Sequence, residues 1–422
     1  MQIHIRNARV IDPQSGFHNK VADLLIEDGI IKNIAASITA KPGTVIEAKG
    51  LCVSPGWIDV FADYREPGFE HKETIKTGLA AAAAGGFAHV LLAPNTQPAL
   101  STKSIIQYVA QQALGNIAEL HPIGAATQNT DGKELAEMLD MRSHGAIVFS
   151  DGWKPVQDAN LMLKALEYVK AFKGIIMQIP VDTALASGGL MNEGIVSTGL
   201  GMAGIPALAE TLSVHRDIEL VRYTGSRLHI TGISTAASVE MVRKAKTEGL
   251  AITCSVTPYH LALTDEALKT YDSIYKVSPP LRCEADRQAL IAGLRDGAID
   301  CIATHHRPHE WDAKTKEFEY AADGMAVQEN AFNILWDALK DEIEIDRLVE
   351  AMTTIPADIF GIDVPAIKKG NRASLTLFTI AGNNTLTAAK AVSMSRNNPF
   401  YGKKLSGKVL GVINNNQLHV NK

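Results

Sequence analysis

Short apolar runs alternate with amphipathic stretches through the middle of the chain. Eight runs have the pattern of buried strands, at residues 57–61, 87–92, 119–124, 145–149, 174–178, 227–231, 250–256 and 299–304. Helical periodicity occupies intervals between them, at residues 104–113, 159–171, 207–222 and 238–246. Apolar strands separated by helices are typical of a parallel sheet buried on both faces. The pattern predicts an α/β fold, a (β/α)8 barrel, with a doubly wound sheet as the alternative.

Both ends of the chain have a different pattern, in which short alternating strands are separated by turn residues. Residues 23–31 predict a hairpin around Asp28-Gly29, and strand-like runs return at 373–378 and 407–413. We therefore expect a small β-sandwich domain built from residues 1–55 and 360–422. The barrel is expected to span residues 56–359.

The composition is that of a soluble globular protein. The 422 residues are 46% hydrophobic and 21% charged, and the net charge is −5. This charge gives no reason to expect nucleic acid or an anionic membrane as partner. No apolar run approaches the roughly 18 residues needed to span a bilayer. No signal peptide is evident and the four cysteines form no CxxC pair, which favours a reduced protein in the cytoplasm.

Polar residues follow several predicted strands, where the chemistry of a (β/α)8 barrel is located. Arg65 follows the first strand and offers a planar fork for a carboxylate, or a structural ion pair. Asn95 follows the second strand and either binds a ligand or shapes a turn. Asp151 follows the fourth strand as a ligand or base, or it caps a helix or closes a turn. His229 lies inside a strand, which favours a core histidine.

Three histidines follow the eighth strand at His305, His306 and His309. Such a concentration is a compositional signal for metal binding. Pro308 bends this segment and no helical spacing brings the three together. Histidines on the surface or in contact with a ligand are therefore the alternative.

Several motifs resemble those of dihydroorotases of the type related to dihydropyrimidinases and allantoinases. They are Arg65-Glu66-Pro67-Gly68 and the runs at 54–59, 81–87, 188–194, 256–260, 279–282 and 398–402. The similarity covers nearly the whole chain. It implies an amidohydrolase-type barrel with a β-sandwich from both termini, and zinc-dependent hydrolysis of dihydroorotate to N-carbamoyl-aspartate.

This chain departs from the zinc-ligand set that the resemblance implies. The ligand positions of the family fall on Phe61, Asp63, Ile179, Gly232 and His305, and one aspartate of a pair is left as Asp151. Zinc lowers the pKa of bound water to about 7 and polarises the scissile carbonyl. The loss of zinc therefore removes most of the assistance to hydrolysis of the cyclic amide. The alternative is a replacement metal site made from Asp63, Asp151, His305 and His306, since Asp and His are competent ligands.

The positions that hold the substrate carboxylate in the family are kept as Arg65, Asn95 and His309. The 304–314 run resembles non-catalytic homologues that assemble with aspartate carbamoyltransferase. We therefore expect a zinc-free pseudoenzyme of pyrimidine biosynthesis, a homo-oligomer that serves aspartate carbamoyltransferase as a structural or regulatory partner. The alternatives are an active dihydroorotase with an atypical metal site and a sensor that binds a dihydroorotate-like molecule. Phe61 and Ile179 predict a pocket partly filled by apolar side chains.

Overall fold

Eight parallel strands form the centre of the computed structural model, which describes residues 1–39 and 43–421. In spatial order they are β6 (Trp57–Ala62), β7 (Phe87–Leu92), β8 (Glu119–Gly124), β9 (Val148–Phe149), β10 (Ile175–Gln178), β13 (Arg227–Thr231), β14 (Ile252–Val256) and β15 (Cys301–Ile302). The segment after β15 returns to β6, where the His305 amide donates to the Phe61 carbonyl at 3.0 Å. The predicted (β/α)8 barrel is confirmed, and the doubly wound alternative is wrong.

Two predicted strands are shorter than the apolar pattern indicates. β9 is only Val148–Phe149, because Gly145 has a φ of 111° and the chain is still leaving a helix there. β15 is only Cys301–Ile302, because the backbone beyond it leaves the ladder with β14 and His305 has a φ of 48°. The polar side chains that follow these strands therefore lie on irregular backbone.

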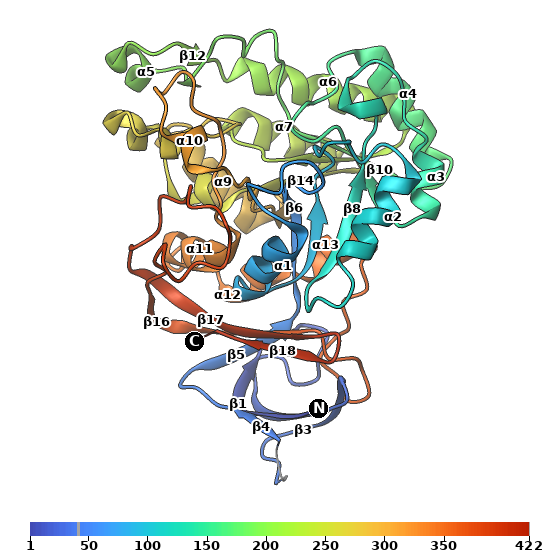
Figure 1. The fold of residues 1–422 in the computed structure, drawn as a ribbon, viewed down its shortest axis with the longest axis vertical. Helices are drawn as coiled ribbons and strands as arrows, with labels where there is room; N and C mark the ends of the chain where they lie inside the picture. The colour runs from blue at the N-terminus through green and yellow to red at the C-terminus, as the bar shows by residue number, and fades with distance from the viewer. Residues whose placement is uncertain (40–42, 422) are drawn as a thin grey trace.

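Helices surround the barrel strands (Figure 1). They are α1 (Ile75–Ala84), α2 (Lys103–Gln112), α3 (Met138–Ser143), α4 (Ala159–Lys170), α5 (Ile195–Leu200), α6 (Leu208–Thr224), α7 (Ala236–Thr247), α8 (Pro258–Ala262), α9 (Glu284–Asp296), α10 (Trp311–Lys314), α11 (Ala331–Leu339), α12 (Ile345–Glu350) and α13 (Thr354–Phe360). Two short strands, β11 (Met191–Asn192) and β12 (Gly204–Ile205), pair outside the barrel. No helix among the described residues is long and apolar enough to cross a membrane.

Capping side chains begin two of the barrel helices. The side chain of Asp158 accepts a hydrogen bond from the Leu161 amide and caps α4, and Thr235 caps α7 in the same way. The four predicted helices are present as α2, α4, α6 and α7, with ends within two residues of the prediction.

Strands from both termini form one further eight-stranded sheet, here called the terminal sheet. Its strands are β1 (Gln2–Val10), β2 (Val21–Glu27), β3 (Ile30–Ala35), β4 (Thr44–Ile46), β5 (Leu51–Pro55), β16 (Leu375–Asn384), β17 (Leu405–Asn414) and β18 (Gln417–Val420). β16 pairs with β5, which joins the two ends of the chain as predicted. The predicted hairpin is β2 and β3, connected at Asp28-Gly29. The domain limits at residues 55 and 360 stay a prediction.

The terminal sheet lies at the N-terminal end of the barrel, below it in Figure 1. β5 ends at Pro55 and β6 begins at Trp57, so one strand leads directly into the other. The polar residues after the barrel strands are thus at the opposite end from the terminal sheet.

Apolar side chains fill the interior of the barrel. They form the lumen cluster: Ile58, Val60, Phe61, Leu91, Ala93, Ile123, Val148, Ile175, Met177, Ile179, Cys301 and Ala303. On β7, Leu91 belongs to this cluster, whereas Val90 and Leu92 pack in the cluster beneath the helices. This alternation is what a strand with one face inward and one face outward requires.

Candidate functional site

Trp153, in the loop after β9, lies at the centre of the C-terminal end of the barrel. Its ring meets Phe61 edge-on, with ring centroids 5.0 Å apart, and meets His305 in the same way at 5.3 Å. Its Nε1 donates to Asp63 Oδ2 at 2.9 Å, and the Arg307 guanidinium lies 4.3 Å from the ring centroid. Sequence reasoning assigned no role to Trp153 or Arg307. The sequence offers one indication of the role of Trp153, its position just after a predicted strand. An indole N–H in such a place usually finds a hydrogen-bond acceptor, here Asp63.

Phe61 and Ile179 are buried members of the lumen cluster, which confirms the prediction that apolar side chains partly fill the pocket at this end of the barrel. Phe61 also packs on His305, with ring centroids 4.9 Å apart. The His305 Nε2 shares a hydrogen bond with Thr231 Oγ1 at 2.9 Å. Phe61, Ile179 and His305, three positions where the resemblance implies metal ligands, thus belong to one packed group.

Gly232 supplies the space that His305 occupies. A Cβ atom built on Gly232 would lie 2.5 Å from His305 Cε1, and Gly232 has a φ of +77°. A side chain at position 232 and the imidazole of His305 therefore exclude each other.

The candidate ligands Asp63, Asp151 and His306 each have a different partner. Asp63 accepts hydrogen bonds from the Arg65 amide and from Trp153, both at 2.9 Å. Asp151 accepts from the amide and the hydroxyl of Thr127. His306 Nε2 lies 3.7 Å from Glu73 Oε2.

These side chains do not converge on one point. Within residues 1–39 and 43–421, no three of Asp63, Asp151, His305 and His306 offer ligand atoms within 4.8 Å of one another. A zinc ion needs three or four such atoms at about 2.0–2.3 Å from a common centre. The residues at this end of the barrel therefore do not fit the zinc site that the resemblance implies.

The histidines after β15 are not on the surface, so that part of the prediction is wrong. His305 and His306 are fully buried and His309 is 4% exposed. Backbone pairing between His306 and Ala62 draws the segment onto β6, a long-range contact that local sequence does not reveal. Burial, with Arg307 and Arg65 nearby, lowers the pKa of His309 to about 2.

Arg65 and His309 each keep one nitrogen without a hydrogen-bond partner in the described part of the chain. For Arg65 it is Nε, while Nη1 pairs with Asp63 Oδ2 at 3.2 Å. For His309 it is Nδ1, while Nε2 bonds the Asp323 carbonyl at 2.9 Å. His309 also lines a cavity of about 200 Å³ beside Trp311.

Asn95 is placed differently from the other two predicted carboxylate-binding residues. Its Nδ2 donates to the Asp151 carbonyl and its Oδ1 accepts from the Trp153 amide, both at 2.9 Å. Its amide therefore holds the loop that carries Trp153, which is the turn-shaping role.

His229 is a satisfied core histidine as predicted, bonded to Thr253 and Ser255.

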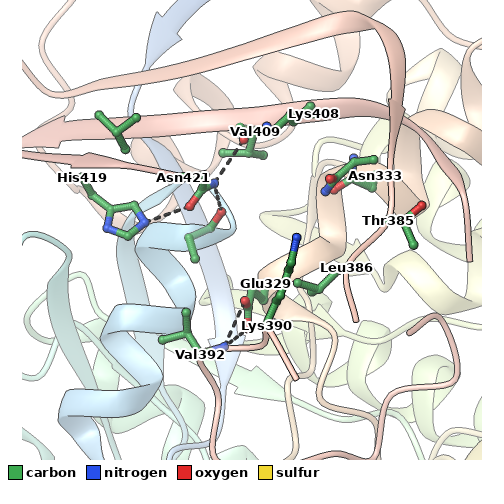
Figure 2. A pocket seen from close by; sticks show the side chains of 13 residues that line it. Glu329, Asn333, Thr385, Leu386, Lys390, Val392, Lys408, Val409, His419 and Asn421 are labelled. Carbon is green, nitrogen blue, oxygen red and sulfur yellow. Dashed lines mark hydrogen bonds between the residues drawn. The ribbon is translucent and has the colours of Figure 1, made fainter. Parts of the chain in front are cut away.

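A separate cavity of about 510 Å³ lies between α11, β17, β18 and the 384–392 segment (Figure 2). Its Glu329 accepts from the Val392 amide at 2.9 Å, and its Asn421 donates to the Ala84 carbonyl at 2.8 Å. These hydrogen bonds hold the 384–392 segment and the end of the chain against the rest of the molecule.

Known proteins resemble this chain over its full length. Residues 50–238 match the family model described as Dihydro-orotase-like. Over 419 residues the chain is 40% identical to the dihydroorotase of Acetivibrio thermocellus, covering 99% of this chain and 98% of that protein. The chain belongs to the dihydroorotase family. The dihydroorotase of Citrifermentans bemidjiense is 39% identical over 416 residues, with 98% of each chain covered.

Solved structures of cyclic amidohydrolases share the fold of this dihydroorotase-family chain. The L-hydantoinase (dihydropyrimidinase) of Arthrobacter aurescens superposes with a TM-score of 0.88 over 100% of this chain and 96% of that chain. The dihydropyrimidinase of Brevibacillus agri superposes with a TM-score of 0.84 over 100% and 95%. At 21% and 22% identity these likenesses show the fold alone.

Asp151 is expected to make the stability of this dihydroorotase-family protein fall as pH rises through the mildly acidic range. Burial raises the pKa of its carboxyl from 3.8 to about 6. Between those values the folded state binds more protons than the unfolded state, so the free energy of unfolding falls by at most about 1.4 kcal/mol per pH unit. Asp151→Asn should remove this dependence of the free energy of unfolding on pH. Urea unfolding at a series of pH values measures it.

The exposed Asp131 provides a control, since Asp131→Asn should keep the wild-type slope. If the free energy of unfolding changes with pH equally in the wild type and in Asp151→Asn, Asp151 is not the cause of the pH dependence.

Proposed function

We propose that this protein is a non-catalytic member of the dihydroorotase family, a structural or regulatory partner of aspartate carbamoyltransferase in pyrimidine biosynthesis in the cytoplasm. The observation that carries the proposal is the packing of Trp153 against Phe61 and His305 where the resemblance implies a zinc site. Aromatic rings occupy this volume, and the Asp63 carboxylate accepts hydrogen bonds from the Trp153 indole and the Arg65 amide.

The surroundings of Asp151 and His305, the two candidate catalytic groups at this end of the barrel, support the proposal. Opening a cyclic amide at neutral pH requires an activated water and a polarised carbonyl. Asp151 is the candidate base with a pKa of about 6, yet both of its oxygens accept hydrogen bonds from Thr127. His305 is buried against Phe61 and its pKa is held well below the usual value by burial.

A dihydroorotate hydrolysis assay of the purified, zinc-supplemented protein tests the proposal. We expect turnover equal to that of buffer alone. A dihydroorotase with an intact His-x-His pair, assayed in parallel, is the positive control. If the protein is instead an active dihydroorotase with an atypical metal site, turnover should be present and should fall in Asp151→Ala or His305→Ala. That result would contradict the non-catalytic proposal.

A sensor of small carboxylates is the second candidate function. It is supported by the unpartnered nitrogens of Arg65 and His309 at the same end of the barrel. Isothermal titration with dihydroorotate and N-carbamoyl-aspartate tests it. Binding heat that is lost on Arg65→Gln would support the sensor, and no heat with either compound would exclude it.

Exposed aromatic side chains near the 304–314 run support the partner proposal. Trp311 is 75% exposed and Tyr320 is 69% exposed. Aromatic residues are enriched among the residues that dominate binding at protein interfaces. We expect co-purification with aspartate carbamoyltransferase, weakened by Trp311→Ala but not by Tyr223→Ala, a control that is 78% exposed on α6.

Size-exclusion chromatography with light scattering checks the assembly directly. We propose a homo-oligomer that forms a larger complex when aspartate carbamoyltransferase is added. A lone monomer in the presence of excess aspartate carbamoyltransferase would argue against the partnership.

A further inference from the structure

Three potential metal ligands meet at the opposite end of the barrel from Trp153. His89 is on β7, and Glu119 and His121 are on the neighbouring strand β8. His89 is the register partner of Glu119, and Glu119 and His121, two residues apart, share one face of β8. One ligand atom from each of the three lies within 4.8 Å of the others.

The distances between these atoms are close to those of a tetrahedral zinc site. His89 Nδ1 lies 3.2 Å from His121 Nε2 and 3.7 Å from Glu119 Oε2. Zinc bonds of about 2.0–2.1 Å at tetrahedral angles place two ligand atoms roughly 3.3–3.4 Å apart. Two histidines and one glutamate are a known set of protein ligands for zinc, which leaves the fourth position to a water molecule. The two distances lie within about 0.4 Å of this separation, and the third pair of ligand atoms lies within 4.8 Å.

The surroundings orient the carboxylate and leave one oxygen free for a metal. Arg372 Nη1 lies 3.0 Å from Glu119 Oε1, and Asn414 Nδ2 lies 3.5 Å from the same oxygen. The other oxygen, Oε2, is the one that faces His89. Hydrogen bonds of this kind hold the ligands of metal sites in place.

The imidazole of His89 is fully buried. Its Nδ1 faces His121 and Glu119, whereas its Nε2 has no hydrogen-bond partner among the described residues. Nδ1 is therefore the nitrogen of this ring that would bind a metal.

We propose that His89, Glu119 and His121 bind a divalent zinc-type metal ion at the N-terminal end of the barrel. The site is structural, because this end of a (β/α)8 barrel serves stability rather than chemistry. Arg372 precedes β16 and Asn414 ends β17, so the ion ties the barrel to the terminal sheet through the residues that hold its carboxylate ligand.

Zinc titration of chelator-treated full-length protein tests the site. We expect one equivalent to bind in calorimetry, a rise in the melting temperature, and an intense visible absorption band when Co²⁺ replaces zinc. Loss of a residue that merely orients a ligand costs about 10–100-fold in metal affinity. Glu119→Gln and His121→Asn, both at partly exposed positions, should therefore each weaken zinc binding at least about 10-fold.

Two further variants locate the metal. His144→Asn is the matched control at a histidine outside the site, and His305→Asn tests the other end of the barrel. Both should bind zinc as the wild type does. Absence of zinc binding, or equal binding by Glu119→Gln and His121→Asn when circular dichroism shows them folded, would overturn the proposal. Zinc lost only in His305→Asn would overturn it as well, and turnover in the hydrolysis assay separately decides the proposed function.

Discussion

Replacing Phe61 with alanine is expected to lower the free energy of unfolding by about 3–5 kcal/mol. The ring is fully buried in the lumen cluster and touches both Trp153 and His305. Strands of the closed barrel hold the walls of the cavity that would remain, so the site can collapse only partly. Equilibrium unfolding in urea, followed by far-UV circular dichroism, measures the change.

Two substitutions serve as controls for the effect of Phe61→Ala. Phe61→Leu keeps most of the volume and should cost less than about 1.5 kcal/mol. Tyr223→Ala, at an exposed position, should stay within about 0.5 kcal/mol of the wild type. A cost below about 1 kcal/mol for Phe61→Ala would mean that this end of the barrel is open rather than packed.

Phe61→His restores the residue that the resemblance places there, and it too is expected to destabilise the protein. The histidine would lie among apolar side chains and beside the neutral ring of His305. An unsatisfied buried polar group costs about 1–3 kcal/mol. We expect no gain of dihydroorotate hydrolysis from this change, because the other positions remain as they are.

Replacing Gly232 with alanine is expected to cost about 2–4 kcal/mol, which is the second large effect. The backbone has a φ of +77°, and a Cβ would lie 2.5 Å from His305 Cε1. Backbone strain accounts for about 1–2 kcal/mol, and the forced movement of the buried imidazole accounts for the rest. The same urea experiment measures the change.

Gly249 is a close match for the backbone part of this effect. It has a φ of +78° with no atom near its Cβ position, so Gly249→Ala should show only the strain. The double variant Gly232→Ala with His305→Ala should lose about 1–3 kcal/mol less than the sum of the two single losses, because the imidazole that the added methyl group would displace is then gone. Equal costs for Gly232→Ala and Gly249→Ala would contradict the steric explanation.

The predicted limits of the barrel strands match the structure at β7, β8 and β13, which begin and end at the predicted residues. β7 is buried along its whole length, whereas β8 and β13 begin at the polar residues Glu119 and Arg227. β9 and β15 are shorter than predicted. Apolar residues continue past the hydrogen-bonded ladder there, and hydrophobicity alone does not mark where the ladder ends.

The candidate site was predictable one position at a time, because position in a strand is local information. The sequence and its resemblance to dihydroorotases indicated Phe61, Ile179 and Gly232 at the C-terminal ends of strands. What those residues touch was not predictable. Trp153 and Arg307 come from two loops, and His305 reaches the space beside Gly232 only when the barrel closes.

The sequence by itself determined the barrel, the joining of both termini and the family, because periodicity and motifs are carried by short segments. Only the tertiary structure decided which side chains share a point in space. His89 and His121 are separated by 32 positions, and the register of β7 against β8 brings their ring nitrogens to 3.2 Å. Register and loop packing depend on the whole closed barrel, so no local pattern could specify these contacts.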